Sequence, residues 1–241
     1  MEHSSASYLN WFDFGVMAAV NQWVGMAPAF DGAVRLLADW HFFRCAPLVA
    51  VLLWAWFDDE AAHARGRLQL GLAAVVCVTM TAKAMQFILP VHTRPFATAA
   101  VLGLKMPAGL AVDWGYGSCF PSDTATLHFA LAALIWSVSR GWGMAATAWV
   151  AIVVAIPRVY LLYHWPSDII GAVMLAFGGV ALLQSSVRAN AVAQHCVEFA
   201  DRKPQVFYPI FFLVLYQCVD SFNAFDFVTE QFKHAARAGR I

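Results

Sequence analysis

The chain has 241 residues, of which 61% are hydrophobic and only 12% are charged, and its formal net charge is zero. Because soluble domains carry about 25% charged residues, this composition excludes an ordinary soluble protein and indicates an integral membrane protein. The charge balance gives no basic surface for nucleic acid. Five scattered cysteines without a C-x-x-C pair give no basis for a disulfide framework or a zinc site.

Successive apolar runs predict an all-α fold, a polytopic transmembrane helical bundle with about six spanning helices. The clear spans are expected at 41–57, 69–89, 122–138, 143–163 and 167–185. A short helix is expected near 30–39, and the apolar segments at 9–28 and 206–225 either span the membrane or lie in its interface. Loops are expected at 58–68, 91–120, 139–143 and 186–205. The N-terminus has no positively charged segment before an apolar run, so we expect no cleavable signal peptide.

We interpret residues 1–241 as one membrane domain with a motif-bearing core at 69–186 and an extra C-terminal apolar helix at about 206–225. In this arrangement the 91–120 loop and the 164–166 turn lie on the same side of the membrane. Polar residues that are far apart in sequence then gather at one membrane face: Arg94, Ser122, Asp123, His164 and Asp168. Lys83 and Arg158 are expected one to two helical turns below that face. Because ionisable groups are costly inside a membrane, this cluster is a candidate functional site.

Three sequence fragments carry the cluster: Lys83-x10-Arg94-Pro95, FPSDT at 120–124, and Arg158-x5-His164-x3-Asp168. Together they resemble the motifs of the type 2 phosphatidic acid phosphatase family of membrane lipid phosphatases, in its polyprenyl diphosphatase-like branch. The third fragment matches the family pattern Arg-x5-His-x3-Asp in full. The first resembles the motif of a basic residue followed by Arg-Pro, in a longer-spaced form. The resemblance implies a metal-independent phosphatase without a cofactor, acting on a lipid phosphate or diphosphate, best a polyprenyl diphosphate.

The phosphate-binding residues follow from elementary chemistry. A phosphate ester needs several positive donors, and arginine supplies planar, permanently charged ones. Pro121 suits the first position of a helix, so the following N–H groups are expected to form an anion site with a serine hydroxyl as an extra donor. We therefore assign phosphate binding to Lys83, Arg94, Ser122, Asp123 and Thr124.

The third fragment supplies the catalytic residues. A neutral imidazole at His164 is a competent nucleophile toward phosphorus. Asp168 is expected to accept from the other ring nitrogen and fix the tautomer, and Arg158 to clamp the phosphate. The family resemblance implies that His164 becomes phosphorylated and that water then releases phosphate.

Thr124 departs from the family pattern, in which a histidine at this position protonates the leaving oxygen and then activates water. His92 and His128 are candidate substitutes. We expect His92 at the rim of the phosphate site, and His128 about 6 Å too deep to contact the leaving oxygen. A diphosphate leaves more readily than an alcohol, so a polyprenyl diphosphate tolerates Thr124 better than phosphatidic acid does.

Two alternatives stay open: a phosphotransferase that passes the phosphoryl group to a lipid or sugar acceptor, and a catalytically impaired lipid-phosphate binding or transport protein. The expected partners are the phosphorylated lipid and the bilayer itself, while the oligomeric state is open. Positive charges are equal on the two sides, so they give no orientation. The resemblance favours a bacterial inner membrane with the site on the extracytoplasmic face. His41 and Arg44 are expected to be interfacial, and Asp13, Asp220 and Asp226 to be helix-end or helix-packing groups.

Overall fold

The structure is a computed structural model that describes residues 11–57, 65–107 and 118–220. Throughout these residues the regular secondary structure is helical, which confirms the predicted all-α class. The elements in chain order are α1 (Trp11–Asn21), α2 (Pro28–Asp39), α3 (His41–Phe57), α4 (Arg65–Ile88), α5 (Pro95–Leu102), α6 (Asp123–Val138), α7 (Arg140–Val150), the π-helical segment η3 (Ala151–Ala155), α8 (Ile156–Tyr160), α9 (Pro166–Ser185), α10 (Val187–Arg202) and α11 (Pro204–Val219).

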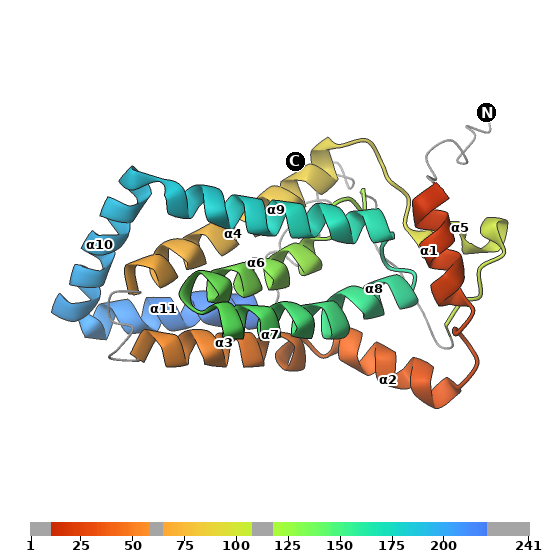
Figure 1. Ribbon diagram of the computed structural model, residues 1–241, viewed down its shortest axis with the longest axis horizontal. Coiled ribbons are helices and arrows are strands. Elements are labelled where there is room, and N and C mark those ends of the chain that lie inside the picture. Colours follow the sequence, from red (N-terminus) through yellow and green to blue (C-terminus); the bar gives the residue numbers. More distant parts are fainter. Residues whose placement is uncertain (1–10, 58–64, 108–117, 221–241) are drawn as a thin grey trace, which may run out of the picture.

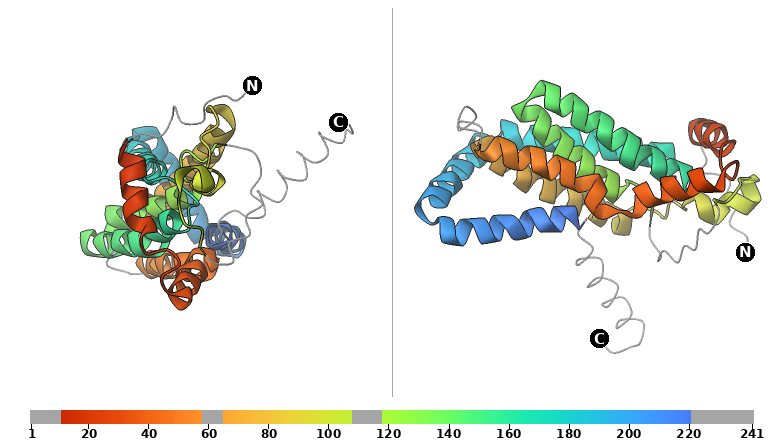
Figure 2. Two further views of the ribbon diagram at one scale, coloured as in Figure 1. Left: turned by 90° about the vertical axis from the view of Figure 1, so that its right-hand side faces the viewer. Right: turned by 90° about the horizontal axis from the view of Figure 1, so that it is seen from below.

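Helix α6 forms the centre of the bundle. It is buried along most of its length and packs against α3, α4, α7 and α9. Helix α10 crosses one end of the molecule and connects α9 to α11, whereas α1 and α5 lie at the other end (Figures 1 and 2). Because α4 ends, α6 begins, α8 ends and α9 begins toward that second end, the three sequence fragments meet there (Figure 1).

Three described helical stretches are long and apolar enough to cross a membrane: Arg65–Ile88, Arg140–Tyr160 and Pro166–Ser185. Helices α2 and α3 give a fourth span if they count as one, although they are bent by 52°. Helices α6 and α11 are apolar but have only 16 residues each. At 1.5 Å per residue they measure about 24 Å, which is shorter than a hydrocarbon core of about 30 Å. The predicted count of about six spans therefore stays a prediction.

Two predicted loops contain whole helices, and the predicted 139–143 loop is reduced to Ser139 because α7 begins at Arg140. The 91–120 loop holds α5, which starts at Pro95 and stops at Gly103, whose φ of 67° is easy only for glycine. The 186–205 loop is mostly α10, because its alanines, glutamines and charged residues favour a helix despite their polarity. Residues 108–117 of the first loop lie outside the described residues. So does the end of the predicted 206–225 helix, of which α11 is the described part.

The span from Arg140 to Tyr160 changes its winding just before Pro157. A proline in a regular α-helix lacks its N–H and collides with the carbonyl four residues earlier. The wider π turn of η3 accommodates the ring, so the helix continues into α8 instead of ending. As a result Arg158 is held inside the protein, with only 5% of its surface exposed.

The chain reverses after α8 at Leu162, whose φ of 60° lies in the left-handed region that non-glycine residues rarely adopt. The Leu162 side chain is fully buried, and its carbonyl accepts a hydrogen bond from Phe96 N at 3.1 Å. These contacts hold a strained backbone two residues before His164. The turn between α8 and α9 is thus fixed by the buried Leu162 side chain and by the hydrogen bond from Phe96 of α5.

Candidate active site

His164 lies in the turn between α8 and α9 and has only 1% of its surface exposed. The carbonyl of Arg158 accepts hydrogen bonds from the N–H groups of Tyr163 and His164, at 3.0 and 3.3 Å. The His164 ring nitrogen Nδ1 lies 3.1 Å from Cys119 O and 3.3 Å from Asp168 Oδ2. Since both of these oxygens accept, Nδ1 carries the hydrogen and Nε2 keeps its lone pair. The free nitrogen Nε2 is the atom that a nucleophilic role requires.

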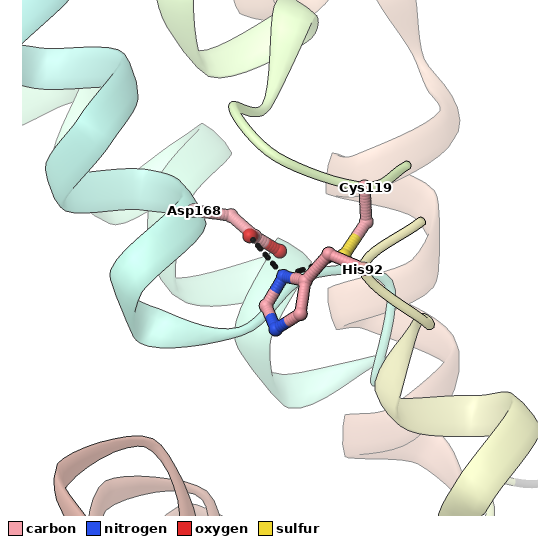
Figure 3. Close-up of side chains that lie close together, drawn as sticks. All are labelled: His92, Cys119 and Asp168. Atoms are coloured by element: carbon pink, nitrogen blue, oxygen red, sulfur yellow. Dashed lines mark hydrogen bonds and ion pairs between the residues drawn. The ribbon is translucent and has the colours of Figure 1, made fainter. Parts of the chain in front are cut away.

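The fully buried carboxylate of Asp168, in the first turn of α9, joins two histidines. Its Oδ2 faces His164 and accepts from Trp165 N at 2.8 Å, while its Oδ1 lies 3.1 Å from His92 Nδ1. Figure 3 shows the His92 ring and the Cys119 thiol meeting at this carboxylate, with Sγ 3.3 Å from His92 Nδ1. The structure brings together His164 and Asp168 as predicted, and it adds His92 as a second partner of the carboxylate.

Arg94 faces the free nitrogen of His164. It immediately precedes α5, and its Nη1 lies 3.2 Å from His164 Nε2 and 3.1 Å from Tyr163 O. A guanidinium group only donates, so an Arg94 N–H points at the lone pair of Nε2. The oxygens of a phosphate placed for attack by Nε2 would lie in reach of the same donor. The position of Arg94 is therefore compatible with the predicted phosphate binding, which stays a prediction.

Arg158 lies beneath this turn and does not touch the His164 ring. Its guanidinium carbon is 5.5 Å from the centroid of the Tyr163 ring, a cation–π arrangement. Its Nε is buried and has no hydrogen-bond partner. Arg158 interacts electrostatically with Arg94 and with His164. Arg94 is thus in direct contact with His164, whereas Arg158 acts on it at longer range.

The second fragment lies against the first and the third. Lys83 Nζ forms an ion pair with Asp123 Oδ2 at 3.0 Å, and Ser122 N donates to Asp168 O at 3.3 Å. Ser122 is the N-cap of α6. The sequence suggested that Pro121 occupies the first helical position, but Pro121 instead precedes the cap. The first N–H groups of α6 are already used: Thr124 N donates to Asp123 Oδ1 and Ala125 N to Ser122 Oγ, at 2.8 and 3.4 Å.

The two candidate substitutes for the missing histidine differ in position. His92 is half-buried and shares Asp168 with His164, so it belongs to the site itself. His128 is fully buried one turn along α6, where its Nδ1 donates to Thr124 O at 2.7 Å. His128 is therefore buried one turn along α6 from Thr124, and its distance from a leaving oxygen stays a prediction. His92 is connected to His164 and Asp168 more closely than a rim position implied.

The environments of the two histidines shift their pKa values in opposite directions. The hydrogen bond to Asp168 raises the pKa of His92 above its usual value, although partial burial opposes it. Burial lowers the pKa of His164, although its own bond to Asp168 opposes it. Near neutral pH the site therefore combines a neutral His164 with a His92 that holds a proton more readily. One nucleophile and one proton donor are the groups that phosphoryl transfer to histidine needs.

One group of described residues is close enough to share a metal ion, His92, Cys119 and Asp168, whose ligand atoms lie within 4.8 Å of one another. Burial raises the pKa of the Cys119 thiol, which opposes the thiolate that a metal would need. Asp168 is also engaged by His164 and by Trp165 N. The prediction that the site needs no metal stays a prediction. A metal ion that contradicted it would bind at this group.

Other residues hold the site but were given no such role from the sequence. The carbonyl of Cys119 lies 3.1 Å from His164 Nδ1 and accepts its hydrogen bond. Asp13 accepts hydrogen bonds from Ser167 N and Oγ at 2.7 and 2.6 Å, and so secures the start of α9 as a packing group. Gly171 lies where an added Cβ would be 2.5 Å from the Phe120 ring, so its lack of a side chain lets the second fragment rest on α9. The only feature of the sequence that pointed to this contact was a glycine inside an apolar run.

The fold and the site define a helical membrane protein in which an arginine faces a histidine that is oriented by a carboxylate. The family model of the PAP2 superfamily matches residues 66–191, and the chain belongs to this family of type 2 phosphatidic acid phosphatases. The Escherichia coli (strain K12) protein named "Putative undecaprenyl-diphosphatase YbjG" is 34% identical over 135 residues. The matched stretch covers 55% of this chain and 62% of YbjG, which is less than two thirds of that relative. No solved structure matches the chain.

Proposed function

We propose that this protein is a membrane lipid phosphatase that hydrolyses a polyprenyl diphosphate through a phosphohistidine at His164. The observation that carries the proposal is the unbroken series of contacts from Arg94 to His164 to Asp168, all within 3.3 Å. It provides a donor for phosphate oxygens, a free ring nitrogen and a carboxylate that stabilises the charged ring. Family membership supports the same chemistry.

In the first step, His164 Nε2 attacks the terminal phosphorus of the lipid diphosphate. The bond from that phosphorus to the bridging oxygen breaks, and its electron pair leaves with the lipid monophosphate. The positive charge that develops on the ring is balanced by Asp168 through Nδ1–H. The Arg94 N–H that contacts Nε2 in the ligand-free protein donates instead to the phosphoryl oxygens that are transferred, which leaves the Nε2 lone pair for the attack.

In the second step, a water oxygen attacks the phosphorus of the phosphohistidine, the N–P bond breaks and phosphate is released. The water must lose a proton, and we assign that proton to His92, which is linked to His164 through Asp168. His92 gives its proton to an oxygen of the departing lipid monophosphate in the first step, and its neutral ring then accepts the proton of the attacking water in the second. No metal is required in this scheme, because the arginines supply positive charge.

The diphosphate preference rests on Thr124. Without a histidine at this position, a substrate with a good leaving group reacts most easily, and a lipid monophosphate is a far better leaving group than an alcohol. The name of YbjG, which specifies an undecaprenyl diphosphate, supports the same choice. We also propose a bacterial inner membrane with the site on the extracytoplasmic face, and six spans in which α6 and α11 join the four spans described above.

The test is phosphate release by the purified full-length protein from farnesyl diphosphate, farnesyl phosphate and phosphatidic acid in detergent. We expect the diphosphate to react fastest and His164→Ala to abolish turnover. His195→Ala is the matched control, because this histidine lies on α10 with 79% of its side chain exposed. Activity of His164→Ala at the level of that control would refute the nucleophile assignment.

Thr124→His separates the remaining alternatives. We expect it to raise the rate on farnesyl phosphate by on the order of 10²-fold and the rate on the diphosphate by less, because a proton donor helps poor leaving groups most. Inactivity of both proteins on every lipid would instead favour lipid-phosphate binding or transport. A rate that depends on an added lipid or sugar acceptor would identify a phosphotransferase.

A further inference from the structure

Four buried side-chain nitrogens in the described part of the chain have no hydrogen-bond partner, and they belong to three residues only. These atoms are Arg44 Nε and Nη1, Arg158 Nε and His128 Nε2. Arg44 and His128 are fully buried, and Arg158 has 5% of its surface exposed. Burying a polar nitrogen without a partner is costly, and a cationic one more so. Such atoms need an explanation, and a bound group that accepts hydrogen bonds would provide one.

The three residues form one cluster, although they come from α3, α6 and α8. Arg44 interacts electrostatically with Arg158, and both interact with His128. Two contacts hold Arg44 in place: Trp149 Nε1 donates to its carbonyl at 3.2 Å, and its Nη2 lies 2.9 Å from His41 Nδ1. The prediction that Arg44 is an interfacial residue is therefore wrong. The start of α3 packs against α7, which turns Arg44 into the protein.

The cluster carries an excess of positive charge. Within the described residues, neither Arg44 nor Arg158 has a carboxylate within ion-pair distance. A buried charge without a partner opposes folding, because the arginine loses its water and gains no opposite charge. The unpartnered Nε and Nη1 of Arg44 lie on different edges of the guanidinium group, because Nε–H shares one edge with Nη2 and Nη1 shares the other, so each can donate to a separate phosphate oxygen.

The cluster is continuous with the catalytic site. Arg158 interacts electrostatically with Arg94 on one side and with Arg44 on the other. Asp123, which pairs with Lys83, interacts with both Arg44 and His164. The positive charges therefore extend from the nucleophile to Arg44. A single phosphate bound at His164 would use only the positive charges at the His164 end of this series.

We propose that Arg44, together with Arg158 and His128, forms a second phosphate subsite that binds the leaving phosphate of a lipid diphosphate while His164 attacks the terminal one. This inference rests on the proposed function and adds a specificity-determining residue to it. Arg44 stabilises the charge on the departing lipid monophosphate, so the reaction depends less on the proton donor that Thr124 cannot supply. His128 Nδ1 donates to Thr124 O, so its Nε2 can accept a hydrogen from a phosphate that is still protonated.

A binding experiment tests the subsite independently of turnover. Methylenediphosphonate, which has two phosphoryl groups and no cleavable bridging oxygen, is compared with inorganic phosphate on the full-length protein in detergent. We expect the parent to bind the diphosphonate at least about tenfold more tightly, and Arg44→Met to lose this difference. Arg44→Lys should retain part of it. The control is Arg202→Gln, which removes an exposed arginine of α10. An unchanged preference in Arg44→Met would overturn the proposal.

The melting temperature of the ligand-free protein separates binding from folding. Because Arg44 is buried without a carboxylate partner, Arg44→Met should leave the melting temperature unchanged or raise it. A lower melting temperature, together with lost binding, would assign Arg44 to packing and overturn the subsite.

Kinetics distinguish failure of this inference from failure of the proposed function. Arg44→Met should slow farnesyl diphosphate hydrolysis by about tenfold or more and leave farnesyl phosphate hydrolysis close to the parent rate, because only the diphosphate has a second phosphate. Equal losses on both substrates would overturn the subsite but leave the phosphatase standing. Full activity of His164→Ala would instead overturn the phosphohistidine mechanism on which the subsite depends.

Discussion

Asp168→Asn removes the negative charge that two histidines share while keeping the size of the side chain. When His164 Nε2 bonds to phosphorus the ring becomes positive, and its Nδ1–H remains beside Asp168 Oδ2, at 3.3 Å in the ligand-free protein. Two opposite unit charges about 4 Å apart interact by about 4 kcal/mol at an effective dielectric constant of 20. Since each 1.36 kcal/mol changes a rate tenfold, the substitution should lower kcat by about 10²–10³-fold.

The assay is phosphate release from farnesyl diphosphate at saturating substrate, with the melting temperature of each variant as a check on folding. Asp201→Asn is the matched control, because Asp201 lies on α10 and has 65% of its side chain exposed. The reasoning fails if folded Asp168→Asn keeps kcat within about threefold of the parent, or if Asp201→Asn loses as much. In either case the carboxylate would not stabilise charge on His164.

Four further predictions follow from the same site. Arg94→Lys should lower kcat by about 10–100-fold, because lysine lacks the planar fork, and a parent-like kcat would remove Arg94 from the clamp. Gly171→Ala should lower activity by about tenfold or more, because its Cβ would lie 2.5 Å from the Phe120 ring. Gly178→Ala on the same helix has open space and should behave as the parent, so equal rates of the two variants would contradict this. Burial lowers the pKa of His164, so kcat/KM should fall only below about pH 6.5, where the nucleophile becomes protonated; a fall that begins between pH 8 and 7 would contradict it. Dialysis against EDTA should leave turnover unchanged, and a loss restored by Mg²⁺ or Zn²⁺ would show a metal at the site.

The third fragment was the most predictable part of the site. Its spacing places Arg158 in the last turn of one helix and Asp168 in the first turn of the next, so the turn between them must carry His164. For Arg94 and His164, the sequence predicted only that both lie at the same membrane face, and it did not predict their contact. The distance between Arg94 and His164 depends on the strained turn at Leu162, and no sequence pattern predicts that turn.

Hydropathy predicted where most helices lie but not what packs on them. Arg44 begins an apolar run, and a charged residue at that place usually faces the interface. The 52° bend between α2 and α3 and the contact with Trp149 instead place it inside the protein. In the same way, helix propensity did not reveal that the first N–H groups of α6 are used by Asp123 and Ser122. Such local competition is decided by side-chain geometry and leaves no periodic signal.

The hydrogen bonds of Asp13 with Ser167 have a consequence for where the functional unit of this protein ends. Asp13 lies on α1, far outside the family-matched residues 66–191, yet it secures the helix that carries Asp168. Tyr160, at the end of α8, likewise donates its hydroxyl hydrogen to Asp31 of α2. A fragment cut to the family-matched segment would therefore keep every motif residue and lose the supports on both sides of the His164 turn. Any fragment of this chain that keeps both supports has to begin before α1 and so includes helices α1 to α3.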